Sequence, residues 1–398
     1  MRIHPSWIVV LAGVSAAMHI SKLPPALPAL QLALNISLVQ AGFLFSMVHL
    51  AGMTLGLGVG LSADALGLRR SMIAGLTILT LASLGGGFAM DVSSLLALRA
   101  LEGLGFLLVV MPAPALIRST VTAQQLSTRI GWWGSYMPLG SAIALLLGPM
   151  ALFWFPWPVW WWLLAAVSCV MGLAVWICVP ATMPVQLTPS AKSGVSHTWQ
   201  QRLGLTLRSS GPWWVALCFA VYSSQWMAVI GFLPTVYSQT GLTTGMTGVL
   251  TACVALVNAV GNVASGRLLQ NGWRAERLLQ IGFLSMTLGA VGAFGQWQGE
   301  SLPLHLRFVC VLAFSGIGGL IPGTLFSSAV RLAPSENTIS TTIGYMQQWS
   351  ALGQFAGPPL VAWVAAIAGG WQWTWAVTVS LSALGLLLAR RIGHAIGH

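Results

Sequence analysis

Charged side chains are scarce in this sequence, where they make up 6% of 398 residues and only six are acidic. Roughly a quarter of the residues are charged in an ordinary soluble domain, so a soluble globular enzyme is excluded. Hydrophobic residues reach 56% instead. Because one membrane span needs about 20 apolar residues, the composition predicts an all-α membrane protein with roughly a dozen spans.

Catalytic and metal-binding motifs are also missing. The sequence contains no GxxxxGKS/T phosphate loop, no HExxH and no GxSxG, so primary transport by this chain alone and metal-dependent hydrolysis lack their usual residues. None of the five cysteines stands in a CxxC pair and all lie in apolar stretches, which predicts small buried side chains without a disulfide. We therefore expect no cofactor, no metal and no enzymatic activity.

Apolar segments separated by short polar or Gly/Pro breaks form two sets of six. They cover residues 6–30, 39–61, 71–90, 94–117, 129–152 and 158–179, then 213–238, 245–268, 276–297, 304–330, 338–365 and 371–390. This predicts an N-terminal six-helix bundle over 1–180, a polar linker over 181–212 and a C-terminal bundle over 213–398. The apolar run that follows Arg2 continues past Lys22 to Pro28, so we interpret it as an uncleaved first helix rather than a signal peptide.

The distribution of lysines and arginines predicts the orientation. All of them except Lys22, Arg99 and Arg307 fall at the termini or in the even-numbered connections. By the positive-inside rule, both termini and the linker are cytoplasmic in a bacterial-type cytoplasmic (inner) membrane. The net charge of +11 is then explained by topology rather than by nucleic acid. The tryptophan runs 160–162 and 371–375 are expected in the aromatic belts at the membrane interfaces.

The second half of the sequence repeats the first. At an offset of 206, Gly42 falls on Gly248 and Gly60 on Gly266; at an offset of 213, Gly103 falls on Gly316 and Arg118 on Arg331. Repeats should be sought before a fold is named. Two halves copied in the same orientation and related by an axis along the membrane normal are typical of one class of secondary transporters.

Sequence motifs give this class a name. The loop Gly60-Leu-Ser-Ala-Asp64-Ala-Leu-Gly67-Leu-Arg69-Arg70 resembles the loop signature of the major facilitator superfamily, although the arginines that usually follow the Asp and the second Gly are missing. The resemblance implies 12 transmembrane helices in two pseudo-symmetric six-helix bundles. It also implies a conformational latch, in which Asp64 caps a neighbouring helix while Arg69 and Arg70 pair across the bundle. The alternative interpretation is a tight glycine turn with topology-setting arginines.

Four further segments resemble parts of this superfamily. The stretch from Leu95 to Gly105 in span four is similar to its second signature, with Glu102 where Gln is common. Gly344, Gly353 and Gly357-Pro358 in span eleven have the spacing that drug antiporters carry in span five. Span five itself has Ala144-Leu145 in place of Gly-Pro, which disfavours a drug antiporter. Leu27-Pro28-Ala-Leu30 and the segment 232–237 resemble the branch of cyanate and nitroimidazole transporters.

Five ionisable residues share one depth in the membrane. At 1.5 Å per residue, we place His19, Lys22, His49, Arg99 and Glu102 about 10–15 Å from the outer ends of their helices. Such residues usually face an internal cavity and mark a transport path. We expect Lys22 and Arg99, with His19 and His49, to bind substrate, and Glu102, with His19, to respond to protons. Alternatives are a purely structural Arg99–Glu102 ion pair and histidines that only join helices.

Counting Lys22 and Arg99 against Glu102 leaves one positive charge, which favours a small anionic or polar solute. Other side chains expected to add hydrogen bonds and aromatic walls are Tyr136, Gln225, Trp226, Gln347 and Gln348. The resulting hypothesis is a monomeric secondary active transporter that works by alternating access, with protons, a small-molecule substrate and the lipid bilayer as its partners. A proton-driven multidrug efflux pump and a non-transporting membrane receptor on the same scaffold remain alternatives.

Overall fold

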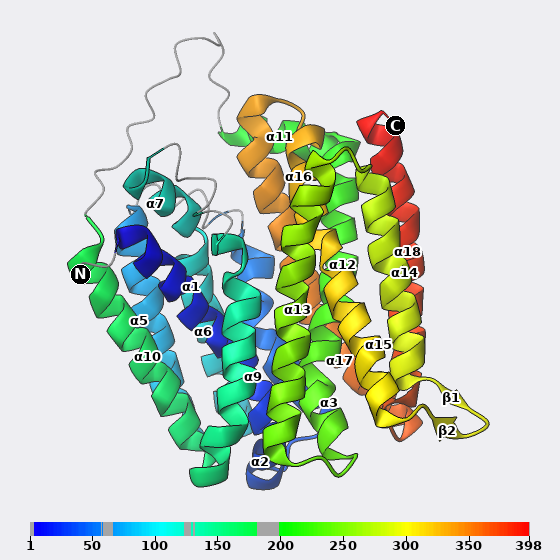
Figure 1. Ribbon diagram of the computed structural model, residues 1–398. Coiled ribbons are helices and arrows are strands. Elements are labelled where there is room, and N and C mark those ends of the chain that lie inside the picture. Colours follow the sequence, from blue (N-terminus) through cyan, green and yellow to red (C-terminus); the bar gives the residue numbers. More distant parts are fainter. Residues whose placement is uncertain are drawn as a thin grey trace.

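The computed structural model describes residues 4–56, 58, 67–122, 129, 132–180 and 199–397. In this part of the chain, eleven helical segments are long and apolar enough to cross a membrane. A twelfth helix, α5 (Leu68–Gly86), packs between α6 and α10. Figure 1 shows these helices as two upright groups, with both chain ends on the same side of the molecule. The prediction of an all-α membrane protein with 12 helices is confirmed.

The first group contains the following helices: α1 (Pro5–Ser21), α2 (Leu23–Leu34), α3 (Leu38–Ser46), η1 (Met47–His49), α5 (Leu68–Gly86), α6 (Val92–Val110), α7 (Ala113–Thr120), α9 (Tyr136–Trp154) and α10 (Trp157–Cys178). Several membrane spans consist of two pieces. For example, α1 and α2 form one span over Pro5–Leu34, and α6 and α7 form one over Val92–Thr120.

The second group is built in the same way, after the short helix α11 (Trp199–Arg208). Its elements are α12 (Ser210–Ser238), α13 (Thr244–Gln270), α14 (Ala275–Phe294), the hairpin β1 (Gln296–Trp297) and β2 (Glu300–Ser301), α15 (Leu304–Gly318), α16 (Leu320–Leu332), η2 (Glu336–Thr338), α17 (Ile339–Ala368), η3 (Trp371–Trp373) and α18 (Thr374–Ile396). The two hairpin strands pair antiparallel.

The first helix of each group is the most enclosed. Of the apolar window in Pro5–Leu34 and in Ser210–Ser238, 89% is buried, compared with 28% in α10. Helices α1 and α12 therefore lie centrally in their groups, whereas α10 is peripheral. Charged groups on α1 are consequently kept from lipid by the surrounding helices.

The two groups touch through α9 against α13, α3 against α17 and α2 against α12. Glycines permit this close approach: a Cβ atom on Gly42 would lie 2.9 Å from the Pro359 Cα atom, and one on Gly248 would lie 3.0 Å from the Pro149 Cγ atom. These contacts lie on the side opposite the chain ends. The two groups are therefore closed together on that side.

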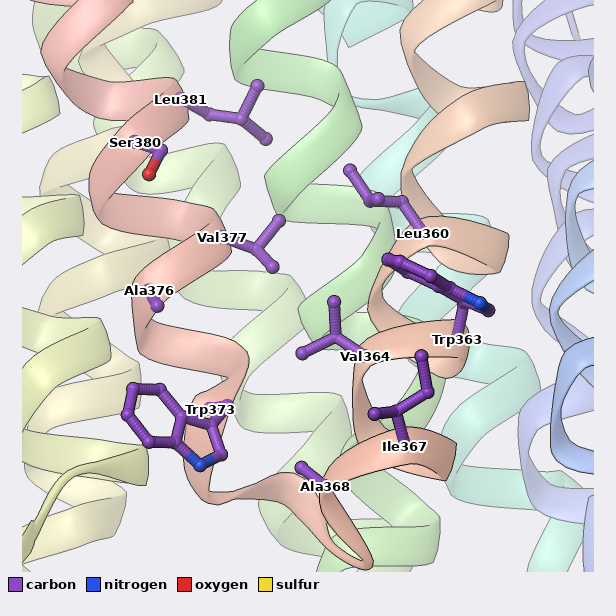
Figure 2. A pocket seen from close by; sticks show the side chains of 10 residues that line it. All are labelled: Leu360, Trp363, Val364, Ile367, Ala368, Trp373, Ala376, Val377, Ser380 and Leu381. Atoms are coloured by element: carbon purple, nitrogen blue, oxygen red, sulfur yellow. The ribbon is translucent and has the colours of Figure 1, made fainter.

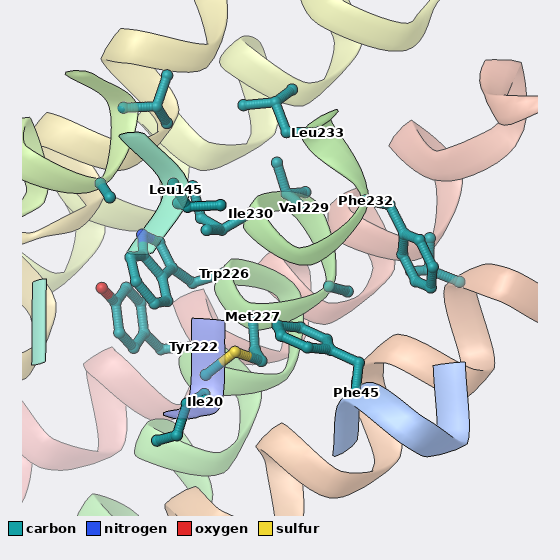
Figure 3. Packing of buried hydrophobic residues seen from close by; sticks show 14 of the residues in the cluster. Ile20, Phe45, Leu145, Tyr222, Trp226, Met227, Val229, Ile230, Phe232 and Leu233 are labelled. Atoms are coloured by element: carbon teal, nitrogen blue, oxygen red, sulfur yellow. The ribbon is translucent and has the colours of Figure 1, made fainter. Parts of the chain in front are cut away.

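Apolar side chains from both groups form one continuous cluster at this contact. Ile20 and Phe45 of the first group lie beside Met227 of α12 (Figure 3). A Cβ atom on Gly231 would meet the Phe45 ring, so the helix surfaces interlock closely here. The contact between the two groups has the packing of a hydrophobic core.

A separate apolar pocket of about 640 Å³ lies between α17 and α18, on the second group alone (Figure 2). Its lining includes Trp363 and Trp373, and its one hydroxyl group belongs to Ser380. Because no charged side chain lines this pocket, it does not suit a small anion.

The structure corrects two expectations from the sequence. Cys169, Cys178 and Cys253 are exposed rather than buried, because they lie on outward faces of helices in an apolar surrounding. Trp160 and Trp161 were expected in the aromatic belt, but their exposed fractions are 3% and 0%. Both point into the first bundle, because α10 turns this face toward α1 and α5.

Candidate functional site

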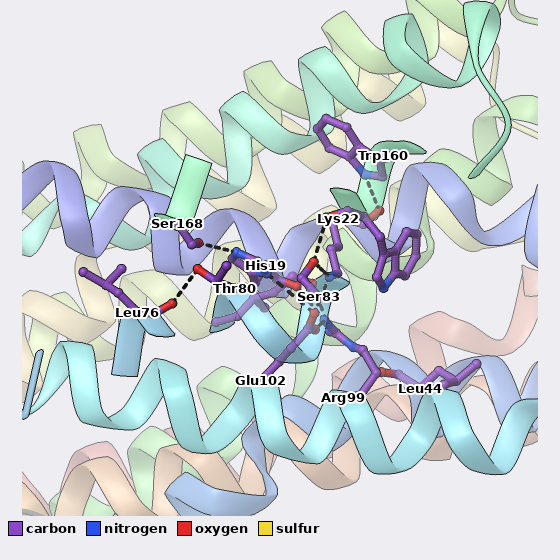
Figure 4. Close-up of polar contacts among 12 residues, drawn as sticks. His19, Lys22, Leu44, Leu76, Thr80, Ser83, Arg99, Glu102, Trp160 and Ser168 are labelled. Carbon is purple, nitrogen blue, oxygen red and sulfur yellow. Dashed lines mark hydrogen bonds and ion pairs between the residues drawn. The ribbon is translucent and has the colours of Figure 1, made fainter. Parts of the chain in front are cut away.

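Four ionisable side chains expected at one depth meet inside the first bundle (Figure 4). His19, Lys22, Arg99 and Glu102, which we call the tetrad, have exposed fractions of 0% or 1%. One Glu102 oxygen, Oε1, accepts a hydrogen bond from Lys22 Nζ, and the other, Oε2, accepts one at 2.5 Å from Arg99 Nη1. His19 Nδ1 lies 3.6 Å from Glu102 Oε1. Two cations thus share one carboxylate, which leaves one positive charge in excess.

Local backbone chemistry explains where Arg99 points. Pro24 and Pro25 lack N–H groups, so they cannot continue the helical hydrogen bonds to the carbonyls four residues earlier, and the helix breaks at Lys22. Arg99 Nη2 lies 3.5 Å from the Ile20 carbonyl oxygen that Pro24 leaves without its helical partner, and Nη1 donates to the His19 carbonyl oxygen at 2.6 Å. Pro24 thus frees the Ile20 carbonyl oxygen, and the break at Lys22 places it beside the His19 carbonyl oxygen, so that a guanidinium fork can reach both.

A second irregular segment supplies another acceptor. Helix α3 ends at Ser46 and continues as the 3₁₀ helix η1, and Arg99 Nε donates to the Leu44 carbonyl oxygen at 3.1 Å. Gly103 lets α6 approach this segment, because a Cβ atom there would lie 2.8 Å from the Val48 carbonyl carbon. Arg99 therefore joins spans one, two and four.

Lys22 is held by the peripheral helices. Its Nζ donates to Ser83 Oγ at 2.8 Å and lies 4.6 Å from the centre of a ring of Trp161. Ser83 in turn donates to the Trp161 carbonyl oxygen, and Trp160 Nε1 donates to the Lys22 carbonyl oxygen. An aromatic face and a hydroxyl group thus supplement the carboxylate in stabilising a buried ammonium.

The two histidines differ in their partners. His19 Nε2 shares a hydrogen bond of 2.7 Å with Ser168 Oγ on α10. His49 lies on η1, which packs against α6, and its Nε2 is buried without a hydrogen-bond partner among the described residues. Among the described residues, His19 Nδ1 is also buried without a hydrogen-bond partner, but it lies 3.6 Å from Glu102 Oε1, whereas His49 has no ion pair.

The second bundle contains a neutral counterpart of the tetrad. The repeat places Gln225 on His19 and Ser315 on Glu102. Gln225 Oε1 accepts a hydrogen bond of 3.0 Å from Ser382 Oγ on α18, just as His19 bonds to Ser168 on α10. The inter-helix hydrogen bond is thus repeated in both halves.

Charge is not repeated. At the same offsets, Ala228 stands for Lys22 and Leu312 for Arg99. Ser315 accepts from Trp226 Nε1 at 3.0 Å, and its carbonyl oxygen accepts from Asn258 Nδ2 at 2.9 Å. Buried charge is therefore restricted, among these equivalent positions, to the first bundle.

The remaining substrate candidates lie apart from the tetrad. Tyr136 stacks on Trp133, with ring centroids 4.4 Å apart. Gln225 and Trp226 point to α18 and α15, within the second bundle. Gln348 Nε2 donates across the two groups to the Met53 carbonyl oxygen at 2.8 Å, and Gln347 is half-buried. The structure thus brings together the N-terminal charged set but not the uncharged set.

The latch candidates are described only in part. Gly60 and Asp64 lie outside the described residues. Gly67 has a φ of 84° and precedes α5, and Arg69 Nη2 donates to the Trp176 carbonyl oxygen at the end of α10. Arg70 is exposed. Arg69 therefore joins two helices of the same bundle in this conformation.

Sequence reasoning missed Ser83, Ser168 and the two buried tryptophans. A serine in an apolar helix carries no distinctive signal, because its hydroxyl group can bond to its own helix. The repeat offered only a faint clue, since Ser382 stands 214 residues after Ser168, one residue beyond the offset of 213. Among the described residues, no group of three or more His, Cys, Asp or Glu is arranged to hold a metal ion.

Known proteins share this architecture. Residues 215–394 match the family model of the Major Facilitator Superfamily. The crystal structure of a bacterial homolog to the human lysosomal transporter Spinster, in an inward-facing and unoccupied conformation, superposes with a TM-score of 0.77 at 15% identity and covers 100% of this chain and 98% of that chain. The second half of the chain thus matches this family, and the whole chain has the fold of that solved transporter. The fold expected from the internal repeat is confirmed.

Curated relatives of this chain have different names. Multidrug resistance protein MdtL of Salmonella typhimurium is 26% identical over 380 residues, which are 93% of this chain and 87% of that protein. Cyanate transport protein CynX of Escherichia coli is 24% identical over 320 residues, 79% of this chain and 78% of that protein. Similarity alone thus does not distinguish a drug from a small anion.

Proposed function

We propose that this protein is a proton-coupled secondary transporter for a small anionic or polar solute, and that its two halves, residues 1–180 and 213–398, rock about the contact between them. The observation that carries the proposal is the tetrad, in which two buried cations share one buried carboxylate. An excess buried cation is costly in a membrane, and its retention in one bundle only fits a role in binding an anion.

Charge conservation links the proton to the anion. With Lys22 and Arg99 cationic, Glu102 anionic and His19 neutral, the tetrad carries a charge of +1. If Glu102 takes up a proton, the two cations lose their shared partner and a monoanion can replace it, which returns the tetrad to +1. The empty and loaded states then bury the same charge, so neither conformational change moves net charge across a low-dielectric core.

The tetrad lies just behind the contact between the two groups. Arg99 Nη2 lies near the Ile20 carbonyl oxygen, and the Ile20 side chain belongs to the apolar cluster shared with Met227 (Figure 3). Separation of the two groups would remove this cover. In the conformation described here the tetrad is fully buried, as expected for the empty carrier with its charges paired internally.

Ligand binding comes first in the experimental test. The melting temperatures of purified wild type, Lys22→Met and the control Arg307→Gln are measured in the presence of each candidate ligand. The ligands are cyanate, nitrate, small carboxylates, nitroimidazoles and lipophilic cations. We expect an anion to raise the melting temperature of the wild type and of the control but not of Lys22→Met. Stabilisation by lipophilic cations that survives Lys22→Met would contradict the proposal.

Transport is then measured in proteoliposomes with the stabilising anion. An imposed proton gradient is expected to drive uptake of a monoanion, and a potassium diffusion potential set with valinomycin is expected to have little effect. Glu102→Gln should abolish gradient-driven uptake but retain exchange of anion for anion, because its neutral amide mimics the protonated carboxyl. Undiminished gradient-driven uptake by Glu102→Gln would disprove the coupling role.

Drug efflux is the second candidate, favoured by the similarity to MdtL. The glycine spacing in α17 supports it less than the sequence suggested. A Cβ atom on Gly353 would lie 2.9 Å from the Ala220 carbonyl carbon, and one on Gly357 would lie 2.7 Å from that of Ser224. These glycines therefore serve close packing of α17 on α12. Broad drug resistance of overexpressing cells, unchanged by Lys22→Met, would favour efflux.

A further inference from the structure

A shallow basic pocket lies at the connection between α13 and α14, away from the tetrad. Its volume is about 280 Å³, and it is lined by Asn271, Gly272, Trp273, Arg274 and Arg277. The two arginines and Trp273 are exposed. We propose that this pocket binds the phosphate headgroup of an anionic phospholipid.

The connection is a turn whose backbone N–H groups are hydrogen-bonded to nearby backbone carbonyls. Gly272 has a φ of 84°, and the N–H groups of Asn271, Gly272 and Trp273 donate to carbonyl oxygens in the last turn of α13. Arg274 precedes α14 without a side-chain hydrogen bond that caps the helix. The arginine side chains are therefore not needed to hold the turn.

No carboxylate neutralises these arginines. In the described part of the chain, neither Arg274 nor Arg277 takes part in an ion pair or a side-chain hydrogen bond. The nearest acid in sequence, Glu276, accepts a hydrogen bond from Gln280 and packs against Gly393 of α18. Two cations thus remain available to an external anion.

The internal repeat explains why the acid is missing. The corresponding connection of the first half carries Asp64 six residues before Arg70, whereas the second half has Gln270 and Asn271 in the equivalent stretch. At the same offset of 206, Arg69 and Arg70 fall on Ala275 and Glu276, so Arg274 and Arg277 stand at shifted positions. The second connection therefore carries two arginines of its own and lacks an acid at the place of Asp64.

An apolar stripe distinguishes a lipid from a free phosphate ion. Below Arg277 on the same face of α14 stand Ile281, Leu284 and Leu288, with exposed fractions of 38%, 49% and 71%. Their spacing of three and four residues places them in one row along the helix. Arg277 at the head of an exposed apolar row matches a molecule with an anionic head and an acyl chain, and Trp273 suits the interfacial depth.

Lipid retention tests this inference. The purified protein in mixed micelles is titrated with phosphatidylglycerol or phosphatidylcholine, and bound lipid is counted by native mass spectrometry. We expect the preference for phosphatidylglycerol to fall by about 25-fold in Arg274→Gln/Arg277→Gln, since each interfacial arginine contributes about fivefold. The control Arg118→Gln/Arg208→Gln, which removes the same charge elsewhere on that side, should keep the preference.

Two further arms keep the test decisive. Arg274→Lys/Arg277→Lys should retain most of the preference, which shows that a loss in the glutamine variant is not a folding defect. Inorganic phosphate is added in competition; displacement of phosphatidylglycerol by phosphate at equal concentration would show a free-phosphate site instead. An unchanged lipid preference in the glutamine variant would overturn the proposal.

Discussion

The shared carboxylate of Glu102 gives a sharp prediction about stability. Glu102→Gln keeps the shape of the side chain but leaves Lys22 and Arg99 as two buried cations without their counter-charge. Removing one partner of a buried ion pair costs about 3–5 kcal/mol, and the low exposure of all three groups places this site in that class. Hydrogen bonds to Ser83 and to backbone carbonyls remain, so we expect the protein to fold.

A second substitution should recover part of the loss. Lys22→Met removes the cation, and in that variant Arg99 still pairs with Glu102 at 2.5 Å, so the cost alone is about 1–2 kcal/mol. In Lys22→Met/Glu102→Gln only one buried cation is left. We expect this double variant to be more stable than Glu102→Gln, with a coupling energy of at least about 1 kcal/mol.

These variants form a double-mutant cycle together with the wild type. The free energy of unfolding of each of the four proteins is measured in SDS titrations of the purified protein in mixed micelles. Glu300→Gln, on the exposed strand β2, is the control for loss of a carboxylate and should change stability by less than about 0.5 kcal/mol. Additive effects of Lys22→Met and Glu102→Gln would refute the reasoning, because independent sites add and paired charges do not.

Two other predictions concern the helix that carries Arg99. Gly103→Ala should destabilise the protein by about 1–3 kcal/mol, because its methyl group would lie 2.8 Å from the Val48 carbonyl carbon. The control is Gly266→Ala, whose methyl group would meet nothing within 4 Å. Equal melting temperatures of the two variants would contradict this prediction. Asp91 Oδ1 accepts from the Ser94 N–H, which lowers the pKa of Asp91. Its stabilisation is thus present above the ordinary pKa and lost as the pH falls through the lower, folded-state pKa, so the melting temperature of Asp91→Ala should depend less on acid pH.

Much of the fold could be read from the sequence because membrane spans are defined locally. A run of about 20 apolar residues has few alternatives to a transmembrane helix, and the arginine distribution and the repeat then order the helices. The depth of Lys22, Arg99 and Glu102 followed from counting residues along single helices. That four ionisable groups would share one level was therefore predictable.

What the sequence could not decide is which face each helix turns to its neighbours. Gln225 and Trp226 were expected to meet substrate but point into their own bundle, and Trp161 was expected at the interface but covers Lys22. In a chain where almost every residue is apolar, hydrophobic periodicity carries little information about orientation.

The sequence by itself thus determined the number, order and approximate depth of the helices, because these depend on length and on local composition. Tertiary structure alone decided that one carboxylate would serve two cations and that Ser83 and Ser168 would complete the site. The reason is that these partners come from α5, α6 and α10, separated from α1 by many residues, and only helix packing selects the faces that meet.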